Sequence, residues 1–180
     1  MSGCSLPVVI NSGSGNQGMP VSLPVIEFAK EWNVSQEKLY RALVVSNLIA
    51  VHQKKYIGSL SAYCGAVSAG CGAGAAITYL SGGTYEDVSL TIVNTIGNVG
   101  GIVCDGAKSS CAAKIASAVD AAILAHYMGQ HHRSFQPGEG IVREDVEDRI
   151  KSMGYIGRVV MKYTDTEILN IMIDRVEIDE

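Results

Sequence analysis

The chain has 180 residues and a formal net charge of -4, with 18% charged residues and 20 glycines. This length is typical of one domain with a sizeable core, so we expect residues 1–180 to form a single domain. The acidic balance argues against nucleic acid as a partner.

The N-terminus carries no recognisable targeting segment. Met1–Gly18 lacks the basic start and apolar stretch of a signal peptide, so we expect a cytoplasmic location. From residue 5 the sequence already resembles the middle of a domain. We therefore expect Met1 to be a late or artificial start and an N-terminal portion to be missing.

The first motif is a glycine-rich turn. Gly13, Gly15 and Gly18 spell G-x-G-x-x-G directly after the β-branched run at 8–10. Successive glycines allow the backbone N–H groups from Ser12 to Gly18 to converge, and a following helix start adds partial positive charge. Such a turn binds a carboxylate as readily as a phosphate. A flexible surface turn is the alternative.

The context of this motif does not favour a dinucleotide-binding fold. That fold requires a helix, a second strand and then an acidic residue for the ribose. Glu31 and Glu37, the acids near the expected offset, fall in helical sequence. Pro20 fits a first helical turn, but Pro24 lies too far inside to allow an uninterrupted helix.

Helical patterns cover most of the remaining chain, which predicts an all-α fold. The helix expected over 34–56 has Ser35 as N-cap and apolar residues at helical spacing. Thr84 with Asp87, and Thr164 with Glu167, match the capping box that opens a helix. The apolar residues of the first helix are Leu39, Leu43, Val44, Leu48 and Val51, and further helices are expected over 88–103, 107–128, 142–153 and 165–174.

A long uncharged run, Tyr56–Tyr85, raises the question of a membrane span. Its length is sufficient, but the run is rich in Gly, Ser and Ala, so the free energy gained by transfer to lipid is small. Small residues at this density instead allow close helix–helix approach. We expect a multi-helix bundle, rich in Gly and Ala, with this segment as its central buried helix and no membrane association.

Five cysteines without a secretory signal argue against a disulfide framework. Cys64 and Cys71 lie in the uncharged run, and Cys104 and Cys111 lie seven positions apart around Gly106. Thiolates from two neighbouring segments could hold an iron–sulfur cluster. Simple packing of buried thiols and a structural zinc ion remain as alternatives, because no CxxC pair is present.

Three segments carry a family resemblance: "NSGSGNQG", "SLSAYCGA" and "NVGGIVCDGAKSSCAAK". They resemble the L-serine dehydratase alpha-chain / L-cysteine desulfidase family, and most closely its cysteine desulfidase-like branch. The resemblance extends over essentially the whole chain, with "CDGAKSSCA" as its most specific part. It implies the C-terminal catalytic portion of a longer architecture, and an N-terminal half or subunit as partner.

The same resemblance implies a chemistry and a site. A 4Fe–4S cluster on Cys64, Cys104 and Cys111 acts as Lewis acid, without pyridoxal phosphate. The reaction is β-elimination from a small L-amino acid, which yields pyruvate and ammonia from L-serine, with sulfide in addition from L-cysteine. A homo-oligomer is expected. The residues expected to bind the substrate are those of the glycine-rich turn: Ser12, Gly13, Ser14, Gly15, Asn16 and Gln17.

Other polar residues are weaker candidates. His52 could be a base or a solvated helix-end residue, and Asp105 could orient the cysteine loop or cap the next helix. His131 and His132 are expected on the surface, as is the acidic group Glu144, Glu147 and Asp148. The general base is not identified. The alternative to a lyase is a non-catalytic helical subunit, or truncated paralogue, that binds a partner chain.

Overall fold

A computed structural model describes residues 4–176, and within them the chain forms α-helices, one π-helix and no β-strand. The predicted all-α fold is confirmed. The elements in chain order are α1 (Gly15–Glu31), α2 (Gln36–Ile57), α3 (Gly65–Leu80), α4 (Tyr85–Val99), α5 (Cys111–Gln130), α6 (Val146–Tyr155), the π-helix η1 (Ile156–Val160) and α7 (Met161–Met172).

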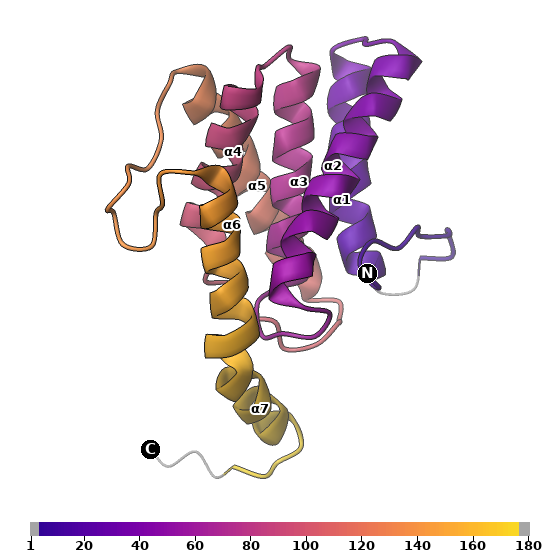
Figure 1. Ribbon diagram of the computed structural model, residues 1–180. Coiled ribbons are helices and arrows are strands. Elements are labelled where there is room, and N and C mark those ends of the chain that lie inside the picture. The colour runs from indigo at the N-terminus through magenta and orange to yellow at the C-terminus, as the bar shows by residue number, and fades with distance from the viewer. Residues whose placement is uncertain (1–3, 177–180) are drawn as a thin grey trace.

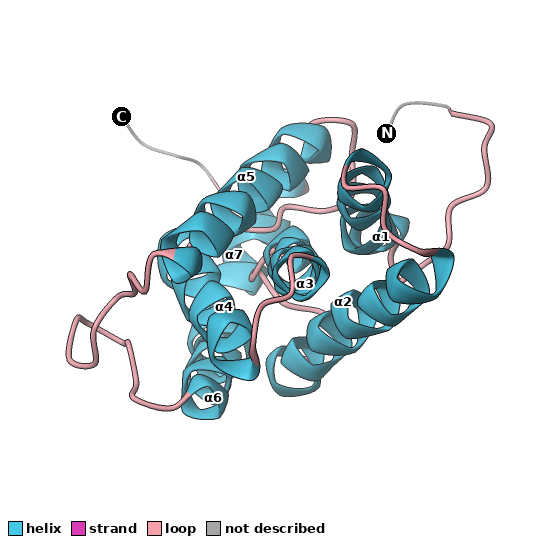
Figure 2. Cartoon of the chain, turned by 90° about the horizontal axis from the view of Figure 1, so that it is seen from above, coloured by secondary structure: helices cyan, strands magenta, loops and turns pink. Residues whose placement is uncertain are grey.

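Helix α3 is the central element of the bundle. Viewed from above, it is surrounded by α1, α2, α4 and α5 (Figure 2). Nearly all of its residues are buried, as predicted for the uncharged run. Its glycines permit close approach on two sides: a Cβ at Gly72 would lie 2.4 Å from the Ser46 carbonyl oxygen of α2, and one at Gly70 2.9 Å from the Ala118 backbone of α5.

The prediction for α1 was wrong. Both Pro20 and Pro24 lie inside one helix, which begins directly after the glycine-rich turn at Gly15. Each proline leaves the carbonyl four residues earlier without its helical N–H donor. Tertiary packing compensates for this loss, because Val21 and Val25 on the same helix are fully buried in the core.

Helix α2 begins as predicted, with Ser35 accepting a hydrogen bond from the Lys38 amide. However, three of its apolar residues face outward: Val44, Leu48 and Val51 are each about half exposed. The buried face carries small and polar side chains instead, among them Ser46, whose hydroxyl donates to the Val21 carbonyl at 2.7 Å. Small side chains are required there because α3 approaches so closely.

The capping box at Thr84 and Asp87 is confirmed, with both reciprocal hydrogen bonds present at the start of α4. The second predicted capping box, Thr164 with Glu167, is wrong. Thr164 lies inside α7, because the π-helix joins α6 and α7 into one continuous helical segment. None of the residues of α7 is buried, and this helix projects away from the bundle (Figure 1).

Over residues 4–176, no helix combines the length and the apolar character that crossing a bilayer demands.

A buried polar network connects α3, α4 and α5. The Nδ1 atom of His126 lies 2.9 Å from the Thr78 hydroxyl, which itself donates to the Gly74 carbonyl and lies 2.9 Å from the Thr91 hydroxyl of α4. The network therefore assigns the proton to Nδ1, and the buried Nε2 atom has no partner among the described residues. Burial lowers the pKa of His126, and the Asp87 carboxylate opposes this in part.

We expect His126 to make the stability of the fold pH-dependent. Below its ordinary pKa of about 6.5 the unfolded chain binds a proton that the folded chain does not, so the free energy of unfolding falls as the pH falls. The slope is at most about 1.4 kcal/mol per pH unit for one group. Urea unfolding between pH 7.5 and 5.5 should show a shallower slope in His126→Gln. The exposed His131→Gln is the control, and an unchanged slope in His126→Gln would contradict the assignment.

Candidate functional site

Cys64 and Cys104 lie side by side because two short segments run antiparallel. The Cys104 amide donates to the Ala62 carbonyl at 2.6 Å, and the Cys64 amide donates to the Ile102 carbonyl at 3.1 Å. Tyr63 and Val103 form an isolated β-bridge between these bonds. Cys64 is also the N-cap of α3, so the start of the central helix fixes its position.

Cys111 reaches the same place from the other end of the loop. It is the first residue of α5, and its thiol lies 3.4 Å from the Gly106 carbonyl oxygen. The chain reverses at Gly106, whose φ of 90° lies in the region that favours glycine. The spacing between Cys104 and Cys111 therefore equals the length of the turn that places the first residue of α5 near Cys64 and Cys104.

The Cys64 and Cys104 thiols shift each other's pKa in opposite directions. The Cys64 thiol lowers the pKa of Cys104 to about 6, against the effect of burial, with further help from the Gly106 backbone. The Cys104 thiol and burial raise the pKa of Cys64. Cys104 therefore favours the thiolate, which is the form of cysteine that binds metals.

Two lysines supply positive charge around these sulfurs, and sequence reasoning did not single out either. Lys114 of α5 donates to the Val103 carbonyl at 2.9 Å and pairs with Asp105, which also pairs with Lys108. Asp105 thus anchors the cysteine loop rather than capping α5, whose N-cap is Ser110. Lys54 of α2 is half-buried; burial lowers its pKa, and the Cys104 and Cys64 sulfurs counteract this.

The glycine-rich turn is a tight reversal followed by the start of α1. Asn11 and Ser14 exchange two backbone hydrogen bonds, with Ser12 and Gly13 at φ values of 50° and 83° between them. This matches a type I′ turn, which requires positive φ at both central positions. The third glycine has another role, because a Cβ at Gly18 would lie 1.7 Å from the Val9 carbonyl oxygen.

The predicted convergence of all amides from Ser12 to Gly18 is wrong. The Ser14 amide donates to Asn11, and the Gln17 and Gly18 amides donate to the Ser14 carbonyl. The remaining N–H groups of the first turn of α1 are those of Gly15 and Asn16. A helix N-terminus offers such amides to an anion. Two of the expected amides, those of Gly15 and Asn16, therefore remain for this role.

Gln17 connects the turn to the cysteines. Its side chain is buried and packs against Gly65, where a Cβ would lie 2.5 Å from the Gln17 amide carbon. The Gln17 Oε1 atom has no hydrogen-bond partner among the described residues. Since Gly65 directly follows Cys64, the amide of Gln17 is held next to the cysteine segment.

These residues share one cavity of about 70 Å³. Of the residues predicted to form the site, Ser12, Gly13 and Gly15 do not line it. Six do: Ser14, Asn16, Gln17, Cys64, Cys104 and Cys111.

The three thiols surround this cavity rather than converging on a point. In residues 4–176, no three His, Cys, Asp or Glu side chains are gathered closely enough to hold a single metal ion. A zinc site requires such convergence, whereas in an iron–sulfur cluster the cysteine ligands are distributed over several irons. Three thiols around one cavity, one of which favours the thiolate, fit the donor set of a cluster.

The remaining candidates lie elsewhere. Cys71 is fully buried in the core, with its thiol 3.9 Å from the Ile92 carbonyl oxygen, and Cys4 is exposed. His52 pairs with Glu147 of α6 at 2.8 Å, so Glu147 is not the purely solvated residue that was expected.

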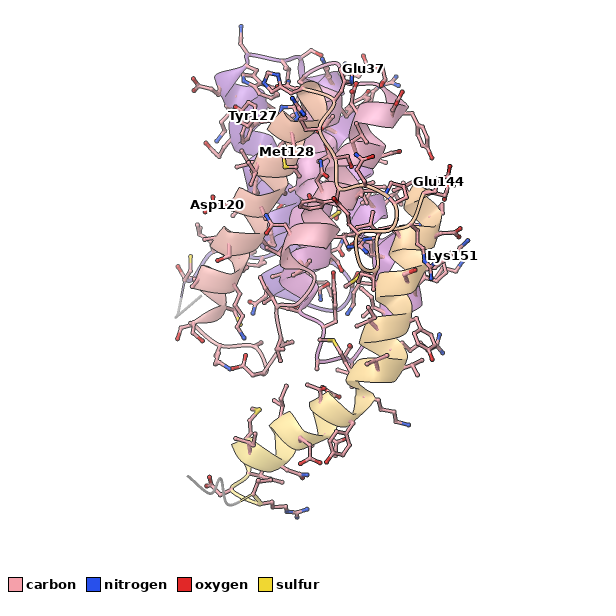
Figure 3. All side chains as sticks on the ribbon, turned by 90° about the vertical axis from the view of Figure 1, so that its left-hand side faces the viewer. Glu37, Asp120, Tyr127, Met128, Glu144 and Lys151 are labelled. Atoms are coloured by element: carbon pink, nitrogen blue, oxygen red, sulfur yellow. The ribbon has the colours of Figure 1, made fainter. Side chains whose placement is uncertain are left out.

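The rest of the predicted surface residues do face solvent. His131, His132, Glu144 and Asp148 are exposed, and Glu144 points outward near the start of α6 (Figure 3).

Comparison with known proteins identifies the relatives of the chain. Residues 1–170 match the family model of the serine dehydratase alpha chain. A UPF0597 protein of Desulfitobacterium hafniense is 60% identical over 97% of this chain and 41% of its own length. UPF0597 proteins of Lachnoclostridium phytofermentans and Treponema denticola are 59% and 56% identical, over 97% and 96% of this chain and 42% and 40% of their own lengths.

The chain thus spans about two fifths of the length of the curated relatives that it matches. No solved structure matches it.

Proposed function

Because the chain belongs to the serine dehydratase alpha-chain family, we propose that it is the cluster-binding part of an iron–sulfur lyase. The substrate class is a small L-amino acid with a thiol or hydroxyl on its β-carbon. The observation that carries the proposal is the single cavity shared by three cysteine thiols and the first turn of α1. Cys64, Cys104 and Cys111 would hold the cluster.

When bound to these three cysteines, a 4Fe–4S cluster would supply Lewis-acid chemistry toward the departing sulfur or oxygen. The chain's own groups bind and orient the substrate. The Asn16 amide and the Gln17 side-chain amide can donate to the substrate carboxylate. Fixing this carboxylate favours removal of the α-proton by stabilising the negative charge that develops.

The overall reaction is a β-elimination. The α-carbon loses a proton, and the electrons of that bond form a double bond as the bond from the β-carbon to sulfur or oxygen breaks. Sulfide or water leaves, and the enamine product hydrolyses to pyruvate and ammonia. No pyridoxal phosphate takes part. The segment of the relatives that lies outside the match, or a separate beta chain, would complete the active site.

The test is an anaerobic assay after reconstitution with iron and sulfide. Pyruvate, with sulfide in addition from L-cysteine, is measured from L-cysteine and from L-serine. The chain is assayed alone and together with the unmatched segment of the D. hafniense relative. We expect products, and a brown absorption near about 400 nm that fades in air.

Two results would overturn the proposal. Cluster-loaded protein that forms no product in either condition would remove the lyase assignment. Colourless protein with reduced, unreactive thiols would instead support the non-catalytic helical subunit.

Gln17 offers a sharper test of the substrate side of the cavity. We expect Gln17→Leu, which keeps the volume and removes the amide, to raise KM at least about tenfold through the lost hydrogen bonds. Iron content should stay at the wild-type level. Gln36→Leu, on the exposed start of α2, is the control. An unchanged KM in Gln17→Leu would show that the carboxylate binds elsewhere.

A further inference from the structure

Arg149 of α6 is buried without a partner. Its relative exposure is only 2%. Neither its Nε nor its Nη1 atom has a hydrogen-bond acceptor in the described part of the chain. None of the ion pairs between residues 4 and 176 includes it. Burying a charge without a partner costs several kcal/mol, so an anion bound to Arg149 would stabilise the folded protein.

A guanidinium donates hydrogen bonds and accepts none, so an acceptor such as a carboxylate can satisfy Arg149.

Arg149 lines a cavity of about 420 Å³ between α4, α6 and the loop that joins α5 to α6. In Figure 1 this loop projects beside α4 and α6. The volume is within the range of sites for small molecules. The lining includes many apolar side chains, among them Ile96, Phe135, Val142, Met153, Ile156 and Met161.

The lining also limits the charge of the ligand. Glu139 is the one carboxylate among the described residues of the cavity wall, and it accepts a hydrogen bond from the Gln136 amide instead of pairing with Arg149. Its charge disfavours a second anionic group on the ligand. The cavity therefore suits one carboxylate on an apolar body.

We propose that this cavity is a binding site for a small monocarboxylate, whose carboxylate is held by Arg149 and whose apolar body packs against α4 and α6. The site is separate from the cysteine cavity, and the proposal does not depend on the lyase assignment. Sequence reasoning missed it because Arg149 has the spacing of an ordinary polar residue on an amphipathic helix.

The test uses the 180-residue chain and 4-methylpentanoate as the probe, in calorimetry and in thermal unfolding at constant ionic strength. We expect one saturable site and a rise in Tm of about 5–10 °C at 100 times Kd. Acetate should bind at least about tenfold more weakly because it buries fewer methylene groups. Uncharged 4-methylpentanamide should not bind, and equal binding of amide and acid would overturn the proposal.

A variant tests the role of Arg149. Arg149→Met should weaken binding at least about 100-fold, because it loses the donors to the carboxylate. The exposed Arg143→Met is the matched control and should bind like the wild type. Arg149→Met should also fold with an unchanged or higher Tm, since it removes an unpaired buried charge. Undiminished binding in Arg149→Met would contradict the site.

Discussion

Serine in place of Cys64, Cys104 or Cys111 is expected to leave a folded chain that binds less than about a tenth of the wild-type iron and has lost at least about 100-fold in lyase activity. The three thiols line one cavity, so each loss removes a sulfur from the same donor set. Iron per chain, absorption near about 400 nm and product formation are the measurements, all after anaerobic reconstitution.

The chain provides its own matched controls. Cys4→Ser changes an exposed thiol, and Cys71→Ala removes a sulfur from the core at a cost of about 1 kcal/mol in unfolding free energy. Both should keep the wild-type iron content. Full iron binding by Cys111→Ser would contradict the ligand set, whereas one colourless metal per chain would favour zinc.

Gly72→Ala is expected to lower the free energy of unfolding by about 2–4 kcal/mol. The new Cβ would lie 2.4 Å from the Ser46 carbonyl oxygen, which belongs to the backbone of α2 and cannot rotate away. Separating two packed helices costs more than the about 1–3 kcal/mol of ordinary overpacking, and the higher helix propensity of alanine returns only about 1 kcal/mol. The measurement is thermal or urea unfolding, with an expected drop in Tm of about 5–15 °C.

Gly101→Ala is the matched control, because no atom lies within 4 Å of a Cβ at that position. It should stay within about 0.5 kcal/mol of the wild type. A Gly72→Ala variant as stable as Gly101→Ala would show that α2 and α3 are not in close contact at this position.

The helical content and two caps could be predicted because they depend on local chemistry. Ser35 and the Thr84–Asp87 pair cap helices through residues at most three positions away, so the sequence contains both partners. Thr164 failed as a cap because a π-helix carries the chain through from α6, which depends on packing against α2. Pro24 was misjudged for the same kind of reason, since burial of Val25 beside it outweighs a missing hydrogen bond.

The candidate site, too, could be predicted from the sequence only in part. The cysteines and the glycine-rich turn could be found by spacing and resemblance, but their meeting in one cavity depends on the antiparallel pairing of 62–64 with 102–104. The roles of Lys54 and Lys114 depend on that pairing too. Arg149 had no sequence signal, because only the folded structure distinguishes a buried arginine from a solvated one.

The composition of α3 constrains the order of events when the protein matures. Four glycines in this helix make it less favourable by about 3–4 kcal/mol than an alanine helix, so the isolated segment has little tendency to be helical. It becomes ordered only when its neighbours enclose it. Cys64, at its N-cap, therefore reaches its final position only once the bundle has assembled. In the iron–sulfur protein that we propose, insertion of the cofactor follows folding and does not nucleate it.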